Sequence, residues 1–170
     1  RLLPAYAPVA GLLRNPKVEV IIDDGRRWLL GNPDKRFDLI VMNTTYYWRS
    51  NASSLLSMEF LRLIRQHLKP GGVHYYNTTS SGEAFLTGVT VFPHALRVMN
   101  FLVVSDYPLD LDKERWQRVL MAYRIEGSPV FELTRQDQRQ ALDGVLSLAD
   151  TLNQDDPSVF ASVGSADSIR

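Results

Sequence analysis

Short apolar runs and amphipathic segments alternate along the first half of the chain. A short helical turn is predicted at residues 26–30 and a longer helix at 55–68, where apolar positions share one helical face. The sequence Lys69-Pro70-Gly71-Gly72 predicts the end of that helix, and Ser80-Ser81-Gly82-Glu83 predicts the capped start of another. Three runs rich in β-branched, aromatic or other apolar side chains predict strands at residues 18–22, 37–42 and 73–76.

The second half predicts two further strands and a last helix. The strand candidates are residues 96–104 and 118–124, separated by a turn and the short stretch 112–116. Thr134 is a candidate cap for the last helix. The inward positions of that helix are predicted to be Leu142, Val145, Leu146, Ala149 and Leu152. Large apolar side chains are scarce from Asn153 onward, so we expect one domain over 1–152 and a loose tail over 153–170.

These elements predict an α/β fold. Strands that alternate with helices form a parallel sheet with right-handed crossovers, and a closing pair joined without a long crossover predicts an antiparallel edge. The run 37–42 is almost entirely apolar, which is typical of a strand covered on both faces. His74 falls inside another such strand, so we interpret it as a core histidine whose hydrogen bonds are satisfied.

Composition narrows the function classes. The chain has 170 residues, 45% of them hydrophobic, with 19 basic and 19 acidic side chains. No Lys/Arg block is present, which argues against nucleic-acid binding. The chain has no cysteine, and its three histidines lack metal-ligand spacing, so we expect no metal site. No apolar run is long enough to span a bilayer.

Polar side chains follow three of the predicted strands. Asp24, Asn43 and Asn77 each stand where a strand ends. Ligands of open parallel sheets bind outside the carboxyl ends of the strands, so these positions form a candidate site. Asp24 has an alternative role, because it can also cap the helix that begins near Arg26.

Three segments in fixed order resemble the spermidine synthase family of polyamine aminopropyltransferases, a branch of the methyltransferase-like Rossmann fold. They are Asn15–Val20 leading to Asp24-Gly25, then Phe37–Asn43, then Leu68–Val73. The similarity covers most of residues 1–105, and the chain looks most like bacterial relatives, some of which carry membrane-spanning segments. The resemblance implies decarboxylated S-adenosylmethionine or S-adenosylmethionine as cofactor, an amine as small-molecule substrate, a role in polyamine biosynthesis, a homodimer, and a cytoplasmic location or the cytoplasmic face of a membrane.

Members of the family open with a strand, a glycine-rich loop and a second strand that ends in an acidic residue. None of these precedes Arg1. In the family, the strand that corresponds to residues 18–22 hydrogen-bonds only to that second strand. We therefore expect 18–22 to have an open edge, and to pair with another chain, detach, or belong to a longer protein.

The resemblance also assigns roles at the strand ends. Asp24 and Gly25 match the pair at the adenine pocket. The resemblance implies that Asn43 and Thr44, in the loop after the next strand, also contact the cofactor. Asn43 stands where the family has the aspartate that deprotonates the amine, and Tyr46 stands in place of a second carboxylate. An amide cannot take a proton near neutral pH, and general-base help is worth roughly a hundredfold to ten-thousandfold, about 3 to 5 kcal/mol. Ordinary spermidine synthesis is therefore not expected.

The same loop is aromatic. Its rings, beside Arg49, predict either a stacking wall for a different substrate or aromatic side chains that pack onto the end of the sheet. These rings are Tyr46, Tyr47 and Trp48. Asn77 stands where the family has glutamine, and the resemblance implies a substrate contact there.

Three hypotheses stay open. The first is a transferase that uses an S-adenosylmethionine-type cofactor for aminopropyl or methyl transfer. The second is a catalytically degenerate domain that binds a nucleoside or a partner. The third is an assembly module that dimerises through its unpaired strand.

Overall fold

The computed structural model describes residues 11, 13, 15–44, 52–125 and 127–152. The chain divides into two compact units, residues 1–33 and 34–170, and each is described by itself. The expected aromatic wall at Tyr46, Tyr47 and Trp48 and the expected tail over 153–170 lie outside the described residues.

The first unit contains helix α2 (Gly25–Gly31) but no strand among its described residues. Residues 18–22 are irregular, and Ile22 is 98% exposed, so the strand predicted there is wrong. A strand exists only where a neighbour completes its hydrogen bonds, and the described residues supply none. Helix α2 begins as predicted, because Asp24 Oδ1 accepts a hydrogen bond from Arg27 N at 2.9 Å.

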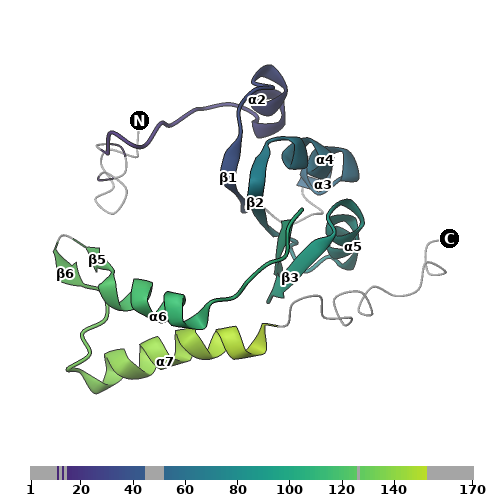
Figure 1. Ribbon diagram of the computed structural model, residues 1–170. Helices are drawn as coiled ribbons and strands as arrows, with labels where there is room; N and C mark the ends of the chain where they lie inside the picture. The colour runs from purple at the N-terminus through teal and green to yellow at the C-terminus, as the bar shows by residue number, and fades with distance from the viewer. Residues whose placement is uncertain (1–10, 12, 14, 45–51, 126, 153–170) are drawn as a thin grey trace. The chain divides into compact units, whose positions relative to one another are not determined.

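The second unit is built on a four-stranded sheet (Figure 1) of strands β1 (Phe37–Met42), β2 (Leu68–Asn77), β3 (His94–Val98) and β4 (Phe101–Ser105). The strand order is β1-β2-β4-β3. Strands β1 and β2 are parallel, whereas β4 is antiparallel to both β2 and β3. The predicted α/β class, with a parallel part and an antiparallel edge, is confirmed.

One strand prediction needs correction. Residues 96–104 are not one strand but parts of β3 and β4, joined by Met99 and Asn100. Met99 has a left-handed backbone with φ 57°, so the tight turn forms without glycine or proline. Strand β2 also begins earlier than predicted, at Leu68, and includes the segment 69–72.

Three helices connect the strands along the chain. Helices α3 (Ala52–Leu55) and α4 (Met58–Gln66) lie between β1 and β2 in the sequence, and α5 (Gly82–Val91) lies between β2 and β3. The predicted helix 55–68 is therefore split, and α4 starts where Ser57 Oγ accepts from Phe60 N at 3.2 Å. Helix α5 starts as predicted, with Ser81 as its cap. Helix α4 contacts β2, and α5 contacts β3 and β4.

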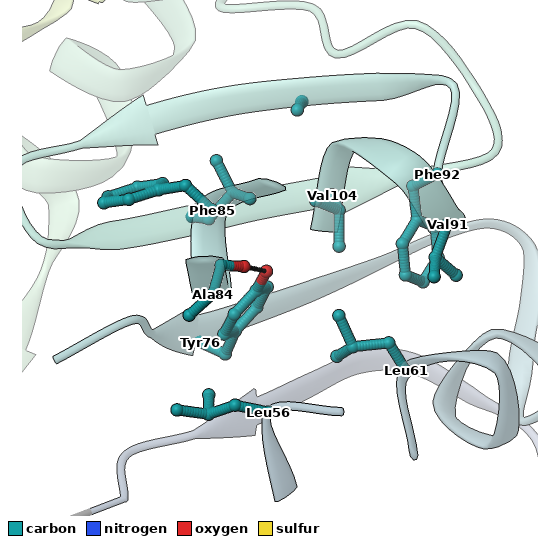
Figure 2. Packing of buried hydrophobic residues seen from close by; sticks show 10 residues of the cluster. Leu56, Leu61, Tyr76, Ala84, Phe85, Val91, Phe92 and Val104 are labelled. Atoms are coloured by element: carbon teal, nitrogen blue, oxygen red, sulfur yellow. Dashed lines mark hydrogen bonds between the residues drawn. The ribbon is translucent and has the colours of Figure 1, made fainter. Parts of the chain in front are cut away.

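The core lies between these helices and one face of the sheet (Figure 2). Tyr76 is fully buried at its centre, and its hydroxyl donates to Ala84 O of α5 at 2.8 Å. The core side chains that surround it are Leu56, Leu61, Ala84, Phe85, Val91, Phe92, Ala95, Leu102 and Val104.

The opposite face of β1 is not covered as predicted. Its apolar pattern suggested burial on both sides, yet Leu39 is 55% exposed and Val41 59% exposed. Strand β1 pairs with β2 alone and therefore forms an end of the sheet within the described part of the chain. We call Leu39 and Val41, with the outer hydrogen-bonding groups of β1, the β1 edge.

The rest of the second unit, as far as the structure describes it, is mostly helical. It comprises α6 (Lys113–Ala122), a small hairpin of β5 (Arg124–Ile125) and β6 (Ser128–Pro129), and α7 (Gln136–Thr151). The strand predicted at 118–124 is wrong, because most of it is helix that starts where Asp112 Oδ1 accepts from Arg115 N at 2.8 Å. Helix α7 has Arg135 rather than Thr134 at its cap, and Leu142 and Leu146 are buried as predicted. None of the helices in the described segments is long and apolar enough to cross a bilayer.

Candidate functional site

Two asparagines meet where the parallel strands end. Leu39 is level with Val73, and each later residue of β1 up to Met42 keeps the same offset of 34 from its partner in β2. Continued by one residue past Met42, this register brings Asn43 level with Asn77. Their side chains are hydrogen-bonded, with Asn77 Nδ2 donating to Asn43 Oδ1 at 2.9 Å. The structure thus brings together two of the three predicted strand-end residues.

A third asparagine completes this cluster. Asn100 precedes β4, which runs antiparallel to β2, so the start of β4 lies at the same edge as the end of β2. Asn100 Nδ2 donates to Asn77 Oδ1 at 2.8 Å, and Thr79 N donates to the same oxygen at 2.8 Å. We call Asn43, Asn77 and Asn100 the amide cluster. Asn100 is not among the site residues predicted from the sequence, where its only signal is an asparagine at a turn.

The loop after β2 is held closely around the cluster. Thr78 is fully buried, and both its backbone N and its hydroxyl donate to Asn100 O, at 2.9 and 2.7 Å. Thr79 and Ser80 have left-handed backbones, with φ 56° and 64°. Such conformations are unfavourable for threonine and persist only where surrounding contacts impose them. The backbone therefore holds the amide cluster in one geometry.

The amide cluster is uncharged. Its members carry neutral amides, and its neighbours Thr78, Thr79 and Ser80 carry hydroxyls. Glu83, in the first turn of α5, accepts from Ser81 Oγ at 2.7 Å, and this hydrogen bond lowers the pKa of its carboxyl. Neutral donors and acceptors bind and orient a ligand, but none of these amides can remove a proton near neutral pH.

Thr44 follows Asn43 in the sequence and carries a hydroxyl whose hydrogen bonding is not satisfied. Its Oγ1 is buried and has no hydrogen-bond partner within the described segments. A buried hydroxyl without a partner is unfavourable by about 1–3 kcal/mol. A ligand oxygen or nitrogen that reached this group would remove that cost.

The other predicted site residues that the structure describes, Asp24 and Gly25, lie in the first unit. Asp24 caps α2, as one of its two interpretations required, and its neighbour Asp23 pairs with Arg27, which lowers the pKa of the Asp23 carboxyl. Gly25 begins the helix, and a Cβ there would meet nothing within 4 Å. The cap leaves the adenine role of Asp24 and Gly25 as a prediction.

His74 belongs to the core, as predicted. It is fully buried, its Nδ1 lies 3.0 Å from Ile40 O, and its ring stacks on Tyr76 with centroids 4.9 Å apart. Burial lowers the pKa of His74 to about 4, so the ring is neutral at physiological pH. Nε2 has no partner in the described part of the chain, so the expectation that this histidine is fully hydrogen-bonded is wrong.

A separate hollow of about 440 Å³ lies beside α6 and α7. It combines carboxylates with an aromatic ring. The Asp112 carboxylate already has partners within the protein, because Oδ1 caps α6 and Oδ2 lies 3.9 Å from Arg118 Nη2. Its lining residues are Asp110, Leu111, Asp112, Arg115, Trp116, Val119, Leu120 and Val145. None of them is a strand-end residue of the sheet. No group of three or more potential metal-ligating side chains occurs within residues that the structure describes.

No family model matches the chain. Among solved structures, it is similar to MNMC2 from Aquifex aeolicus, with 18% identity and a TM-score of 0.45 over 83% of this chain and 50% of that chain. It is also similar to a probable spermidine synthase from Corynebacterium glutamicum ATCC 13032, with 18% identity and a TM-score of 0.44 over 72% of this chain and 53% of that chain. The chain thus spans about half the length of each structure.

Proposed function

We propose that this chain is part of a transferase-like domain that binds a nucleoside cofactor of the S-adenosylmethionine type. The observation that supports it most is the hydrogen bond between Asn43 and Asn77, because it joins two strand ends at the edge where parallel sheets bind ligands. The sequence motif around Asn43 and Thr44 stands at this edge. Aminopropyl or methyl transfer is the proposed chemistry, with Asn43 in the position of the family's base.

Binding of the cofactor is the direct test. The full chain is titrated calorimetrically with S-adenosylmethionine, decarboxylated S-adenosylmethionine and methylthioadenosine. The proposal expects saturable heat with at least one of them. Absence of heat with all three would remove the nucleoside function.

The role of Asp24 can be separated from its capping role. Serine caps helices about as well as aspartate but has a shorter side chain. Asp24→Ser should therefore keep α2 folded and weaken nucleoside binding by about tenfold, since it removes a hydrogen bond to a charged group. Unchanged affinity in this variant would show that Asp24 is only a cap.

Assembly is the second candidate function, and exposure of the β1 edge favours it. If two copies paired their β1 strands antiparallel about Ile40, Leu39 of one copy would face Val41 of the other. The contact would bring four apolar side chains next to one another on one face of the joined sheet, and it would pair the outer backbone groups of both strands. This is the specific form of the homodimer that we propose.

Sedimentation velocity tests the assembly. Val41→Lys should shift a dimer to monomer, because lysine at an edge strand opposes pairing. Val119→Lys is the matched control, since Val119 is 56% exposed and Val41 59%. A monomer at all concentrations in the unmodified chain, or equal effects of both substitutions, would exclude pairing through the β1 edge.

A further inference from the structure

The hydrogen bonds of the amide cluster define which way each side-chain amide is oriented, and the sequence does not reveal this. We call this set of orientations the direction of the amide cluster. A backbone N–H can only donate a hydrogen bond. Because Thr79 N donates to the side chain of Asn77 at 2.8 Å, the atom that it reaches must be the oxygen Oδ1. Asn100 Nδ2 donates to the same atom, which fills both of its acceptor positions.

The orientation of the Asn77 amide in turn determines the orientation of the Asn43 amide. With Oδ1 occupied, the nitrogen Nδ2 of Asn77 faces Asn43 and donates to it. The atom of Asn43 that receives this bond must therefore be its oxygen. The Nδ2 group of Asn43 then points away from Asn77, and within the described segments no residue accepts from it. Asn43 is exposed, so this donor is accessible to a ligand.

An exposed donor selects its partner by chemistry. The Nδ2 group of Asn43 can donate a hydrogen bond to a lone pair on oxygen or nitrogen. It has no lone pair that could accept a hydrogen bond from an ammonium group, which can only donate. The amide cluster contains no carboxylate to hold a cation, and the Glu83 carboxylate is engaged by Ser81. Thr44 offers a buried hydroxyl, which can also donate, next to Asn43 in the chain.

We propose that this end of the site binds a carbonyl-type oxygen of the substrate rather than the ammonium group of a diamine. This inference rests on the proposed transferase function and names the substrate class of the same site. Asn43 is the residue that contacts the oxygen. Asn77 is a positioning residue, because it determines which end of the Asn43 amide faces the ligand.

Two substitutions should reverse the preference. Asn43→Asp keeps an acceptor for Asn77 Nδ2 but replaces the outward donor by a carboxylate oxygen. Asn77→Asp keeps the bonds from Thr79 and Asn100, yet it turns an oxygen toward Asn43 Oδ1. The Asn43 amide should then turn over, donate to Asp at position 77, and present its own oxygen outward.

Asn15→Asp is the matched control. Asn15 is exposed in the first unit, and its Oδ1 accepts from Lys17 N at 3.0 Å, a bond that aspartate also accepts. The control therefore adds the same charge and keeps its local hydrogen bond. Glu83→Gln is a second control, which removes the carboxylate in the first turn of α5.

The probes are N,N,N′,N′-tetramethylsuccinamide, which is uncharged and only accepts, and putrescine, which carries two ammonium groups. Binding is followed by NMR through the side-chain amide of Asn43, or the backbone amide of Thr44 where position 43 is changed. The full chain should bind the diamide about tenfold more tightly than putrescine, as expected for one hydrogen bond gained or lost. Asn43→Asp and Asn77→Asp should each invert that ratio, whereas Asn15→Asp and Glu83→Gln should leave it unchanged.

Several results would overturn the inference. They are tighter binding of putrescine by the unmodified chain, an unchanged ratio in Asn77→Asp, or no response of Asn43 to either probe. Methylthioadenosine is titrated in parallel, so the two proposals can fail separately. A diamide preference without nucleoside binding removes the cofactor function and keeps the oxygen preference. Nucleoside binding without a diamide preference removes only the oxygen preference.

Discussion

Gly88 is the described glycine at which an added Cβ would come closest to other atoms. It lies within α5, and a Cβ added there would come 2.5 Å from Leu102 Cδ2 and closer still to the Tyr76 hydroxyl. Real Cβ atoms do not approach other atoms so closely, so the neighbours must shift. Both neighbours are fully buried, and Tyr76 is also held by its bond to Ala84 O and its stack on His74. Because protein cores are close-packed, a shift of either side chain is unfavourable.

The substitution Gly88→Ala should therefore destabilise the second unit. Overpacking of a core is unfavourable by about 1–3 kcal/mol, and loss of the Tyr76 hydrogen bond adds roughly 1 kcal/mol. The higher helix propensity of alanine offsets about 1 kcal/mol. The net loss is about 2 kcal/mol, which corresponds to a decrease in Tm of roughly 4–8 °C.

Urea unfolding followed by circular dichroism measures the loss, with Gly144→Ala as the control. Gly144 also lies inside a helix, α7, but a Cβ there meets nothing within 4 Å, so this variant should gain up to about 1 kcal/mol. Combining Gly88→Ala with Tyr76→Phe should cost less than the sum of the two, because the hydroxyl in the way is gone. Equal stability of the two alanine variants, or strict additivity of the pair, would refute the packing argument.

Three further predictions concern the same unit. Burial lowers the pKa of His74 from 6.5 to about 4, so the stability that its neutral ring contributes is present above pH 6.5 and is lost as pH falls toward 4. From pH 7 to pH 5, the free energy of unfolding of the unmodified chain should therefore decrease by about 2 kcal/mol more than that of His74→Phe, as urea unfolding at the two pH values measures. Ser81→Ala removes the cap of α5 and should lower stability by about 1 kcal/mol in urea unfolding, with rescue by aspartate but not by valine. Gly72→Ala would bring a Cβ to 2.8 Å from a backbone oxygen and should lower Tm, whereas Gly82→Ala, which meets nothing within 4 Å, should not; similar melting curves would contradict this.

The sequence by itself determined the elements whose hydrogen bonds are local. The start of α2 at Asp24 and the start of α5 at Ser81 follow from capping side chains that bond within three residues of themselves. The cap at Asp112 identifies α6 in the same way, although the apolar run 118–124 taken alone predicts a strand. A short apolar run does not distinguish a strand from a buried or half-buried helix, so the cap was the better signal there.

Only the tertiary structure decided what depends on partners distant in sequence. Residues 18–22 have the composition of a strand but no partner strand among the described residues, whereas β1 has β2 and is a strand. The direction of the amide cluster depends on Thr79 N and Asn100, which reach Asn77 only after β2 and β4 have paired. The exposure of Leu39 and Val41 depends on which face the helices cover. Strand pairing, side-chain hydrogen bonds between strands and burial are properties of contacts between segments, and a single segment does not contain them.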